Sequence, residues 1–568
     1  MYLLFVFFMK WIASHFAITH PNLSLLCAII SSKRETMLLS KTSDVYDSIE
    51  NMQTILQNID INVVFKKEFN PIHNLFWANL ICEDIPHYVF SNGKGSTFEA
   101  SKASALGEFI ERLATHNFFS EFYIPNQKHF QDEVAFEYKR GYLNPKLLKF
   151  YNPNRELEAR NMIDFNSDET QKIIALPFKN IMSGEEIFFP ISILQNLYAS
   201  NGLASGNSPI EAQIQALSEI IERFVKFEVI KNEYALPSFP LEVIEKFPKL
   251  KESVEFLESL GYEVRVLDSS LGGLFPVSAI ALINPKNGTL FVSFGSHPML
   301  EVCLERTMSE LMQGRTLKDL DNFETPTFDR ELVSDSSNLE SHFIDSNGKI
   351  SFGFLSDRKS FDYSVWAHRG DDREKELAYL VNIFKELKKE VYLREYQELG
   401  FYACSMIVPD FSEVYPIDDL VYNNKNEAKF IREKILNFKD YDLREIIDEL
   451  DEHDETIDVG KYIGVVFKQP FSIREFKIHL LLLLGEKSDA LELLRYGSNN
   501  LLGEVIKELL LLELQELAFD DFKTSLYRIF GQDLVNSALD IIDNRASLLD
   551  LEFDEEYINI LKLYEKIV

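Results

Sequence analysis

The sequence predicts a mixed α/β (α+β) protein in which repeated β-loop-α units precede an all-helical region. Three observations support this expectation: a length of 568 residues, three stretches that share one plan, and a change to helix-rich sequence near residue 441. A chain of this length needs more than one domain, because single cores stop growing at about 250–300 residues. Hydrophobic residues make up 46% of the chain, which excludes disorder as the main theme.

The charge balance excludes one class of partner. Acidic residues number 90 and basic residues 58, for a formal net charge of -32. DNA and other nucleic acids are therefore not expected as partners, since their binding depends mainly on Lys and Arg contacts to phosphates. The balance suits a basic protein partner, or a carboxylate cluster that binds cations. The four cysteines form no C-x-x-C pair, which indicates a reducing compartment and no zinc site.

Residues 1–36 form a doubtful leader. The apolar run MYLLFVFFMKWIASHF is interrupted by Lys10 and is shorter than the about 20 residues that span a bilayer, so no membrane attachment is expected. A signal peptide would need a basic segment before this run and a small-residue cleavage site close behind it. We favour translation from Met37, where the sequence becomes polar. A peripheral or signal-like leader and an ordered segment are the alternatives.

Three stretches repeat a β-rich run, a loop rich in Gly, Ser and Asn, and a helix with Glu in its first turns. They cover residues 87–119, 196–230 and 289–315. In the first two, the matching positions are Ser91-Asn92-Gly93 with Ser200-Asn201-Gly202, and Glu108, Glu111 and Arg112 with Glu219, Glu222 and Arg223. This repetition indicates duplicated β-loop-α units rather than a short-period solenoid.

Each repeated helix separates an apolar stripe from a polar one. The apolar stripes are Leu106, Phe109, Ile110 and Leu113, then Leu217, Ile220, Ile221 and Phe224, at the spacing of a core face. The polar stripes are Ser104, Glu108, Glu111 and Thr115, then Gln215, Glu219 and Glu222, then Arg306, Glu310 and Gln313. A solvated surface would explain one such stripe, but it gives no reason for the same residues to recur beside the same core face.

The recurring stripes therefore predict a shared site for a metal and an anion. Converging carboxylates repel one another unless cations lie between them. Mg²⁺ prefers carboxylate oxygens and leaves positions open for phosphates. We expect Glu to bind the metal, Arg to bind phosphates, and the Gly/Asn loops to let the backbone approach the ligand. Neither a Walker sequence nor G-x-G-x-x-G is present, and Gly93-Lys94-Gly95 is too short for a P-loop.

The segments GKGSTFEASKASALGEFIERL, SNGLASGNSPIEAQIQALSEIIERF and LERTMSELMQGR closely resemble the YcaO family of ATP-utilising proteins. The resemblance implies a YcaO-type ATP-binding domain at 37–440, with ATP and Mg²⁺ as cofactors. From about residue 441 the sequence is rich in helical patterns, and a spacing near 31 residues between two similar helical pairs is typical of tetratricopeptide-like hairpins, although the 34-residue consensus is not met. We therefore expect an all-α, tetratricopeptide-like domain at 441–568 for protein contact or dimerisation; a packing appendage is the alternative.

The resemblance also implies which residues bind these ligands. For ATP and its phosphates they are Lys41, Ser48, Ser104, Asn207, Glu211, Gln215, Arg223 and Arg306. For Mg²⁺ they are Glu108, Glu111, Glu219, Glu222 and Glu310. Ala204 departs from the family pattern, which has a nucleotide-side serine there, although Ser205 is adjacent. No catalytic residue is assigned.

As the resemblance implies it, the family's chemistry is ATP-dependent phosphorylation of an amide oxygen, after which a nucleophile attacks the activated carbon. The C-terminal region is similar to that of members linked with β-methylthiolation of an aspartate in small-subunit ribosomal protein S-twelve. We therefore expect a cytoplasmic accessory factor whose partners are the methylthiotransferase or the ribosomal protein, with a homodimer suggested by family analogy. The alternatives are a peptide-modifying enzyme that forms azolines or thioamides, which the proline-free end LYEKIV disfavours, and a non-catalytic nucleotide-binding scaffold.

Overall fold

The computed structural model describes residues 38–137, 141–366, 370, 372–497 and 500–568. The expected leader 1–36 and the start at Met37 lie outside the described residues. Within the described part of the chain, no helix is both long and apolar enough to cross a membrane. The described cysteines, Cys82, Cys303 and Cys404, are free and buried.

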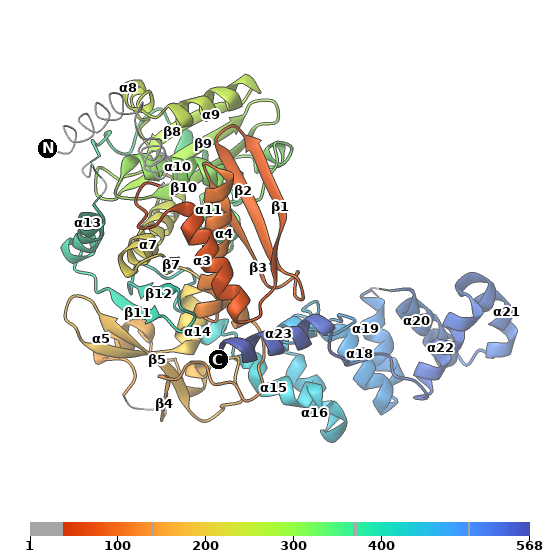
Figure 1. Ribbon diagram of the computed structural model, residues 1–568. Helices are drawn as coiled ribbons and strands as arrows, with labels where there is room; N and C mark the ends of the chain where they lie inside the picture. Colours follow the sequence, from red (N-terminus) through yellow and green to blue (C-terminus); the bar gives the residue numbers. More distant parts are fainter. Residues whose placement is uncertain (1–37, 138–140, 367–369, 371, 498–499) are drawn as a thin grey trace, which may run out of the picture.

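Three sheets, each made of antiparallel strand pairs, form the framework (Figure 1). The first has the order β1 (Val63–Ile72), β2 (Leu75–Cys82) and β3 (Phe90–Gly95). The second has the order β10 (Thr289–Ser296), β9 (Val277–Asn284) and β8 (Glu263–Asp268). The third runs β4 (Val134–Phe136), β5 (Ile173–Asn180), β11 (Tyr392–Tyr396), β12 (Tyr402–Ile407) and β7 (Leu203–Gly206), with β6 (Glu186–Pro190) beside β5. Antiparallel sheets with separate helices confirm the predicted α+β class.

One long helix follows a strand in each repeated unit. These helices are α4 (Phe98–Ala114) after β3, α7 (Pro209–Lys231) after β7, and α10 (Leu300–Met312) after β10. Thr97 and Ser208 cap the first two, because each side chain accepts a hydrogen bond from a first-turn amide. The predicted core faces are buried: Leu106, Phe109, Leu217 and Ile220 are all inaccessible to solvent.

Much of the predicted glycine-rich loops is strand, although Ser200, Asn201 and Gly202 lie in a turn. Ser91–Gly95 lies within β3 and Leu203–Gly206 forms β7, whereas the run before β7 is a π-helix at Leu194–Tyr198. The glycines pack against the following helix, and Gly95 and Gly206 also line the cavity between the repeated helices, so their expected role beside a ligand stays a prediction. A Cβ on Gly93 would lie 2.0 Å from the Ser101 carbonyl oxygen, one on Gly206 2.8 Å from the Ala212 nitrogen, and one on Gly295 2.4 Å from the Thr307 hydroxyl. In each unit a glycine thus lets the helix pack closely on its strand.

Further α-helices complete the region before residue 427. They are α3 (Val45–Asn58), α5 (Pro145–Tyr151), α6 (Ile191–Ile193), α8 (Leu241–Ile244), α9 (Pro248–Ser259), α11 (Arg330–Ser334), α12 (Ser336–Ile344), α13 (Arg373–Glu386) and α14 (Asp419–Tyr422). Helix α3 packs against α4 and places the segment around Lys41 beside the repeated helices.

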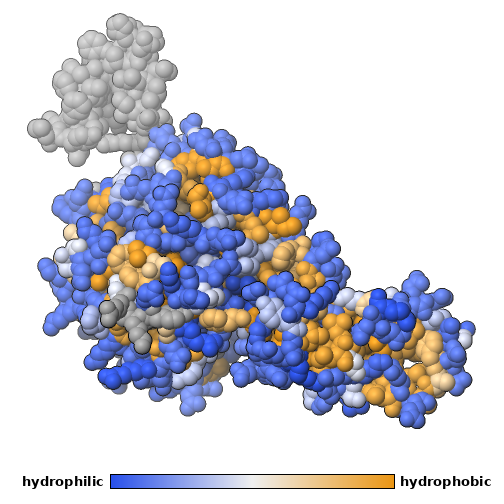
Figure 2. Space-filling view, turned by 90° about the horizontal axis from the view of Figure 1, so that it is seen from below, coloured by the Kyte–Doolittle hydropathy of each residue, from blue (hydrophilic) through white to orange (hydrophobic). Residues whose placement is uncertain are grey.

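The C-terminal region is helical, as predicted, and extends from the rest of the molecule as an arm (Figure 1). Its helices are α15 (Glu427–Leu436), α16 (Leu443–Leu450), α17 (Val459–Ile463), α18 (Ile473–Leu484), α19 (Lys487–Arg495), α20 (Leu501–Leu514), α21 (Phe519–Phe530), α22 (Gln532–Ile542) and α23 (Glu555–Ile567). Apolar side chains gather on the surface of the arm (Figure 2), among them Leu501, Phe522 and Ile529. The boundary at residue 440 stays a prediction.

The last helix leaves the arm and returns to the N-terminal part of the fold. Ile560, Leu563 and Tyr564 of α23 are buried in the same core as Leu56 of α3 and Phe109 of α4. The Tyr564 hydroxyl donates a hydrogen bond to the Lys128 carbonyl oxygen at 2.7 Å. The chain end is therefore part of the core that supports the first repeated unit.

Candidate nucleotide site

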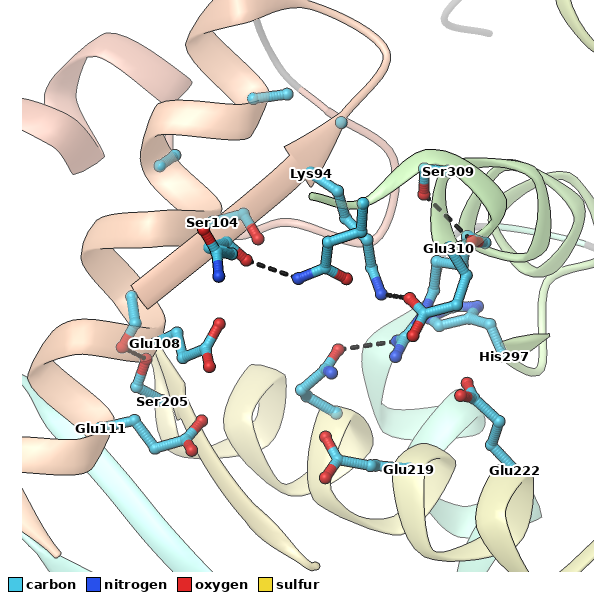
Figure 3. A pocket seen from close by; sticks show the side chains of 18 of the residues that line it. Lys94, Ser104, Glu108, Glu111, Ser205, Glu219, Glu222, His297, Ser309 and Glu310 are labelled. Atoms are coloured by element: carbon cyan, nitrogen blue, oxygen red, sulfur yellow. Dashed lines mark hydrogen bonds and ion pairs between the residues drawn. The ribbon is translucent and has the colours of Figure 1, made fainter. Parts of the chain in front are cut away.

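The three repeated helices face one cavity of about 820 Å³, the first cavity. Every residue predicted for the site lines it: Lys41, Ser48, Ser104, Glu108, Glu111, Asn207, Glu211, Gln215, Glu219, Glu222, Arg223, Arg306 and Glu310. Figure 3 shows glutamate side chains from all three helices projecting into the space between them. The structure thus brings the predicted residues together, while the role of each one stays a prediction.

Basic side chains form ion pairs with several of the glutamates. Lys94 of β3 forms an ion pair with Glu310 (Figure 3). The Arg223 Nη2 atom lies 2.9 Å from Glu219 Oε1, and Arg112 lies 3.5 Å from both Glu108 and Glu111. Among the described residues, no three His, Cys, Asp or Glu side chains form a group that could hold a metal ion. A cation of the protein therefore lies beside Glu108, Glu111, Glu219 and Glu310, whereas Glu222 accepts a hydrogen bond from the Ser296 amide at 3.2 Å.

This arrangement still fits Mg²⁺ bound together with a nucleotide. Proteins usually hold Mg²⁺ by one or two carboxylates plus substrate phosphates, rather than by a cage of protein ligands. Burial above all, together with the nearby carboxylates of Glu219 and Glu108, raises the pKa of Glu111 to about 8 against the opposing effect of Arg112. Glu111 is therefore short of positive charge, which is the condition that a bound cation would relieve.

The cavity also has unsatisfied donors for an anion. The Arg223 Nη1 atom is buried and has no hydrogen-bond partner in the described structure, and its guanidinium lies over the Phe343 ring at 4.4 Å. Arg306 donates from Nη1 to the Gln215 side-chain oxygen at 2.7 Å, which orients its guanidinium. Burial lowers the pKa of Lys94 to about 8, although Glu222 opposes that shift. Such cations suit the oxygens of phosphates.

Glu211 holds the segment around Lys41 and Thr42 at the edge of the first cavity. Its carboxylate accepts hydrogen bonds from Lys41 Nζ at 3.0 Å, from the Thr42 backbone at 3.1 Å and from the Asn207 amide at 3.2 Å. Although burial raises the pKa of Glu211, the Lys41 charge and the Thr42 donors lower it on balance. Glu211 is therefore an ionised anchor for the segment that carries Lys41.

The serines that line the first cavity differ in the hydrogen bonds that their hydroxyls make within the protein. Ser48 donates to the Asp44 carbonyl oxygen at 2.8 Å, and Ser205 donates to the Gly107 carbonyl oxygen at 2.8 Å. Ser205, the neighbour of Ala204, therefore connects β7 to α4 as well as lining the cavity. Ser104 lies one turn before Glu108 on the cavity side of α4 (Figure 3).

Several lining residues were not on the predicted list. Lys94 was set aside with the short Gly-Lys-Gly sequence, and Arg112 was aligned with Arg223 without being assigned to the site. His297 also lines the cavity; its Nδ1 accepts from the Met299 amide, so its Nε2 carries the proton and lies 3.1 Å from the Ser40 hydroxyl. Ser40 donates in turn to the buried Glu376 at 2.6 Å, which secures the segment next to Lys41. The alignment signalled Arg112, whereas this last network depends on a long-range contact with no local sequence signal.

Comparison with known proteins places this site in a family. The family model described as YcaO cyclodehydratase, ATP- and Mg²⁺-binding, matches residues 92–412. The model of the YcaO cyclodehydratase C-terminal domain matches residues 428–568. The chain therefore belongs to the YcaO family.

Two curated relatives are similar over most of the chain. The ribosomal protein S12 methylthiotransferase accessory factor YcaO of Escherichia coli is 35% identical over 94% of this chain and 98% of its own. An uncharacterised protein of Haemophilus influenzae is 38% identical over 81% of this chain and 82% of its own. Among solved structures, YcaO from Methanopyrus kandleri bound with AMPPCP and Mg²⁺ is 17% identical with a TM-score of 0.42, covering 68% of this chain and 94% of its own.

Proposed function

We propose that the first cavity binds Mg–ATP and that the chain acts as an accessory factor in methylthiolation of ribosomal protein S12. The observation that carries the nucleotide part is the convergence of the predicted glutamates and arginines from three repeated helices on one cavity. The description of the family and the name of the Escherichia coli relative support the two parts of the proposal.

The chain's own residues would divide the work. Arg223 and Arg306 would hold phosphate oxygens, since one has an unpaired buried donor and the other is oriented by Gln215. Glu108, Glu111, Glu219, Glu222 and Glu310 are the candidate ligands of Mg²⁺. When bound, Mg²⁺ supplies charge neutralisation for the phosphates. Lys41, held by Glu211, would close the cavity at the edge that the segment around Lys41 forms.

The reaction we propose is transfer of a phosphoryl or nucleotidyl group from ATP to an acceptor oxygen. A bond forms between this oxygen and phosphorus while the P–O bond to the leaving ADP or pyrophosphate breaks, which makes a poor leaving oxygen into a good one. Azoline or thioamide formation on a peptide would be an alternative use of the same cavity, as would a scaffold that binds ATP without turnover. We also propose that the chain acts in the cytoplasm, that its partners are the methylthiotransferase and S12, and that it forms a homodimer.

Two single variants test the site. Glu219→Ala and Arg306→Ala should each reduce Mg-dependent ATP binding or hydrolysis by about 100-fold, as expected when one preorganised charged contact is lost. Circular dichroism and thermal melting should show that both proteins fold. Unchanged turnover in both folded variants would refute the site assignment. If the wild-type chain binds ATP but does not turn it over in the presence of S12 and the methylthiotransferase, the non-catalytic scaffold would instead be favoured.

A further inference from the structure

A second cavity of about 430 Å³ adjoins the first. Ser200 and Phe343 line both of them. Aromatic rings form much of the remaining wall of the second cavity: Phe118, Phe130, Tyr198, Tyr396 and Tyr415. Its volume lies within the about 300–1,000 Å³ of typical small-molecule sites.

Asn201 supplies an unsatisfied polar group to this cavity. The residue is only 4% exposed and lines the second cavity. Its amide nitrogen donates to the Ser412 carbonyl oxygen at 2.7 Å, which fixes the orientation of the side chain. The Oδ1 atom is buried and has no partner in the described structure. Because a carboxamide oxygen only accepts hydrogen bonds, a ligand for it must bring a donor.

The backbone around the second cavity is strained at two non-glycine residues. Ala199 has φ 48° and ψ −119°, and His116 has φ 58°. A π-helix, Leu194–Tyr198, ends directly before Ala199. Both strained residues and the end of this π-helix line the cavity. Strain of this kind costs about 1–3 kcal/mol per residue and gathers at binding sites, as π-helical turns also do.

The wall of the second cavity is close to neutral. Its charged members are paired: Glu121 with Lys425 at 3.3 Å, His129 with Asp164 at 3.3 Å, and His87 with Glu556. Burial lowers the pKa of His116 to about 3, so its imidazole is uncharged at neutral pH. The wall therefore does not favour a charged ligand.

We propose that the second cavity binds an uncharged ligand with an apolar or aromatic body and an N–H or O–H donor, which Asn201 recognises. We further infer that this ligand is the acceptor in the reaction of the first cavity, a step that rests on the proposed function. The observation behind this step is that Phe343 lines both cavities, with its ring centroid 4.4 Å from the Arg223 guanidinium of the first cavity.

Benzamide is a suitable probe, because it is neutral and aromatic and carries an N–H donor. Acetophenone has a methyl group in place of that donor, and benzoate carries a charge. By ligand-observed NMR titration of the full chain, benzamide should bind saturably and at least about tenfold more tightly than either analogue, which corresponds to about 1.4 kcal/mol. Asn201→Leu should remove this preference, whereas Asn58→Leu on the exposed end of α3 should not.

Ser405→Met provides a second variant, because it fills the cavity from β12 without touching Asn201's hydrogen bond. Benzamide binding should be lost in this protein while Mg–ATP binding stays within twofold of wild type. Equal affinities for benzamide and acetophenone, full benzamide binding to Ser405→Met, or no saturable binding to wild type would each overturn the proposal. Failure of the nucleotide proposal is seen separately, as absence of Mg–ATP binding to the wild-type chain.

Discussion

The first and second cavities share two residues, yet their walls differ in chemistry. Glutamates from three helices and the basic side chains beside them line the first cavity, whereas aromatic rings and neutral amides line much of the second. The first cavity comes from a repeated strand–helix plan, but the second has strained backbone at single positions, Ala199 and His116. The difference suggests that a duplicated framework created the charged cavity and that local irregularity shaped the neutral one.

The largest effect should come from removing Arg223, the cation of the first cavity whose Nη1 atom has no hydrogen-bond partner in the described structure. Arg223→Ala should lower Mg-dependent ATP turnover by about 100–1,000-fold, because one preorganised donor to a developing charge is lost. Steady-state phosphate release measures this effect. Arg495→Ala, on the exposed surface of α19, is the matched control and should keep wild-type turnover. Equal losses in the two variants would mean that the charge pattern of the first cavity has no special role.

The repeated plan itself can be tested through its glycines. Gly93→Ala should reduce the free energy of unfolding by about 1–3 kcal/mol, because overpacking forces a strand away from its helix. The new Cβ would lie 2.0 Å from a backbone oxygen of α4, whereas a Cβ on Gly107 would meet only the Ser205 hydroxyl, at 3.3 Å. Chemical denaturation should therefore show a much smaller change for Gly107→Ala. Similar stability of both variants would contradict the close-packing role.

Lys94 should matter for nucleotide binding more than its omission from the predicted site suggests. Lys94→Met should weaken ATP affinity by about tenfold, equivalent to about 1.4 kcal/mol, and leave benzamide binding unchanged. Isothermal titration with each ligand would separate the two cavities. Weakening of both ligands together would show that the cavities are not chemically distinct.

The smallest effect concerns pH in the absence of Mg²⁺. The pKa of Glu111 is raised from 4.5 to about 8, so the folded chain retains a proton that the unfolded chain loses between these values. The contribution of Glu111 to stability therefore falls as pH rises from about 4.5 to about 8 and then levels off. Glu111→Gln should flatten this part of the melting-temperature profile, while Glu50→Gln on the surface of α3 should not. A melting-temperature profile that Glu111→Gln leaves unchanged would contradict the raised pKa of this buried carboxyl group.

The sequence was informative where the repeat was present. Helical spacing predicted the buried faces of α4 and α7, and recurrence predicted that Glu108 and Glu219 would face a common site. The close packing of the glycines on a helix was not predicted, because a glycine that admits a ligand and one that admits a helix look the same in sequence. The carboxylates line one cavity as expected, but basic side chains that lie beside them, such as Lys94, were not on the predicted list. The second cavity could not be foreseen, since its wall joins distant segments and its strain is conformational.

The return of α23 to the N-terminal core affects how the C-terminal region should be tested. Removing residues 441–568 would take away Leu563 and Tyr564, which belong to the core around α4. Substitutions on the exposed face of the arm, such as Ile529→Glu, test partner binding without this damage, since Ile529 is 72% exposed.

The most direct test of the central claim is a crystal structure of the chain with Mg²⁺ and a non-hydrolysable ATP analogue. We predict phosphate oxygens within hydrogen-bond distance of Arg223 and Arg306, and Mg²⁺ between those phosphates and glutamates of the first cavity. Release of Glu310 or Glu219 from its basic partner should accompany binding. Phosphates bound elsewhere, with the glutamates still paired as they are here, would contradict the account.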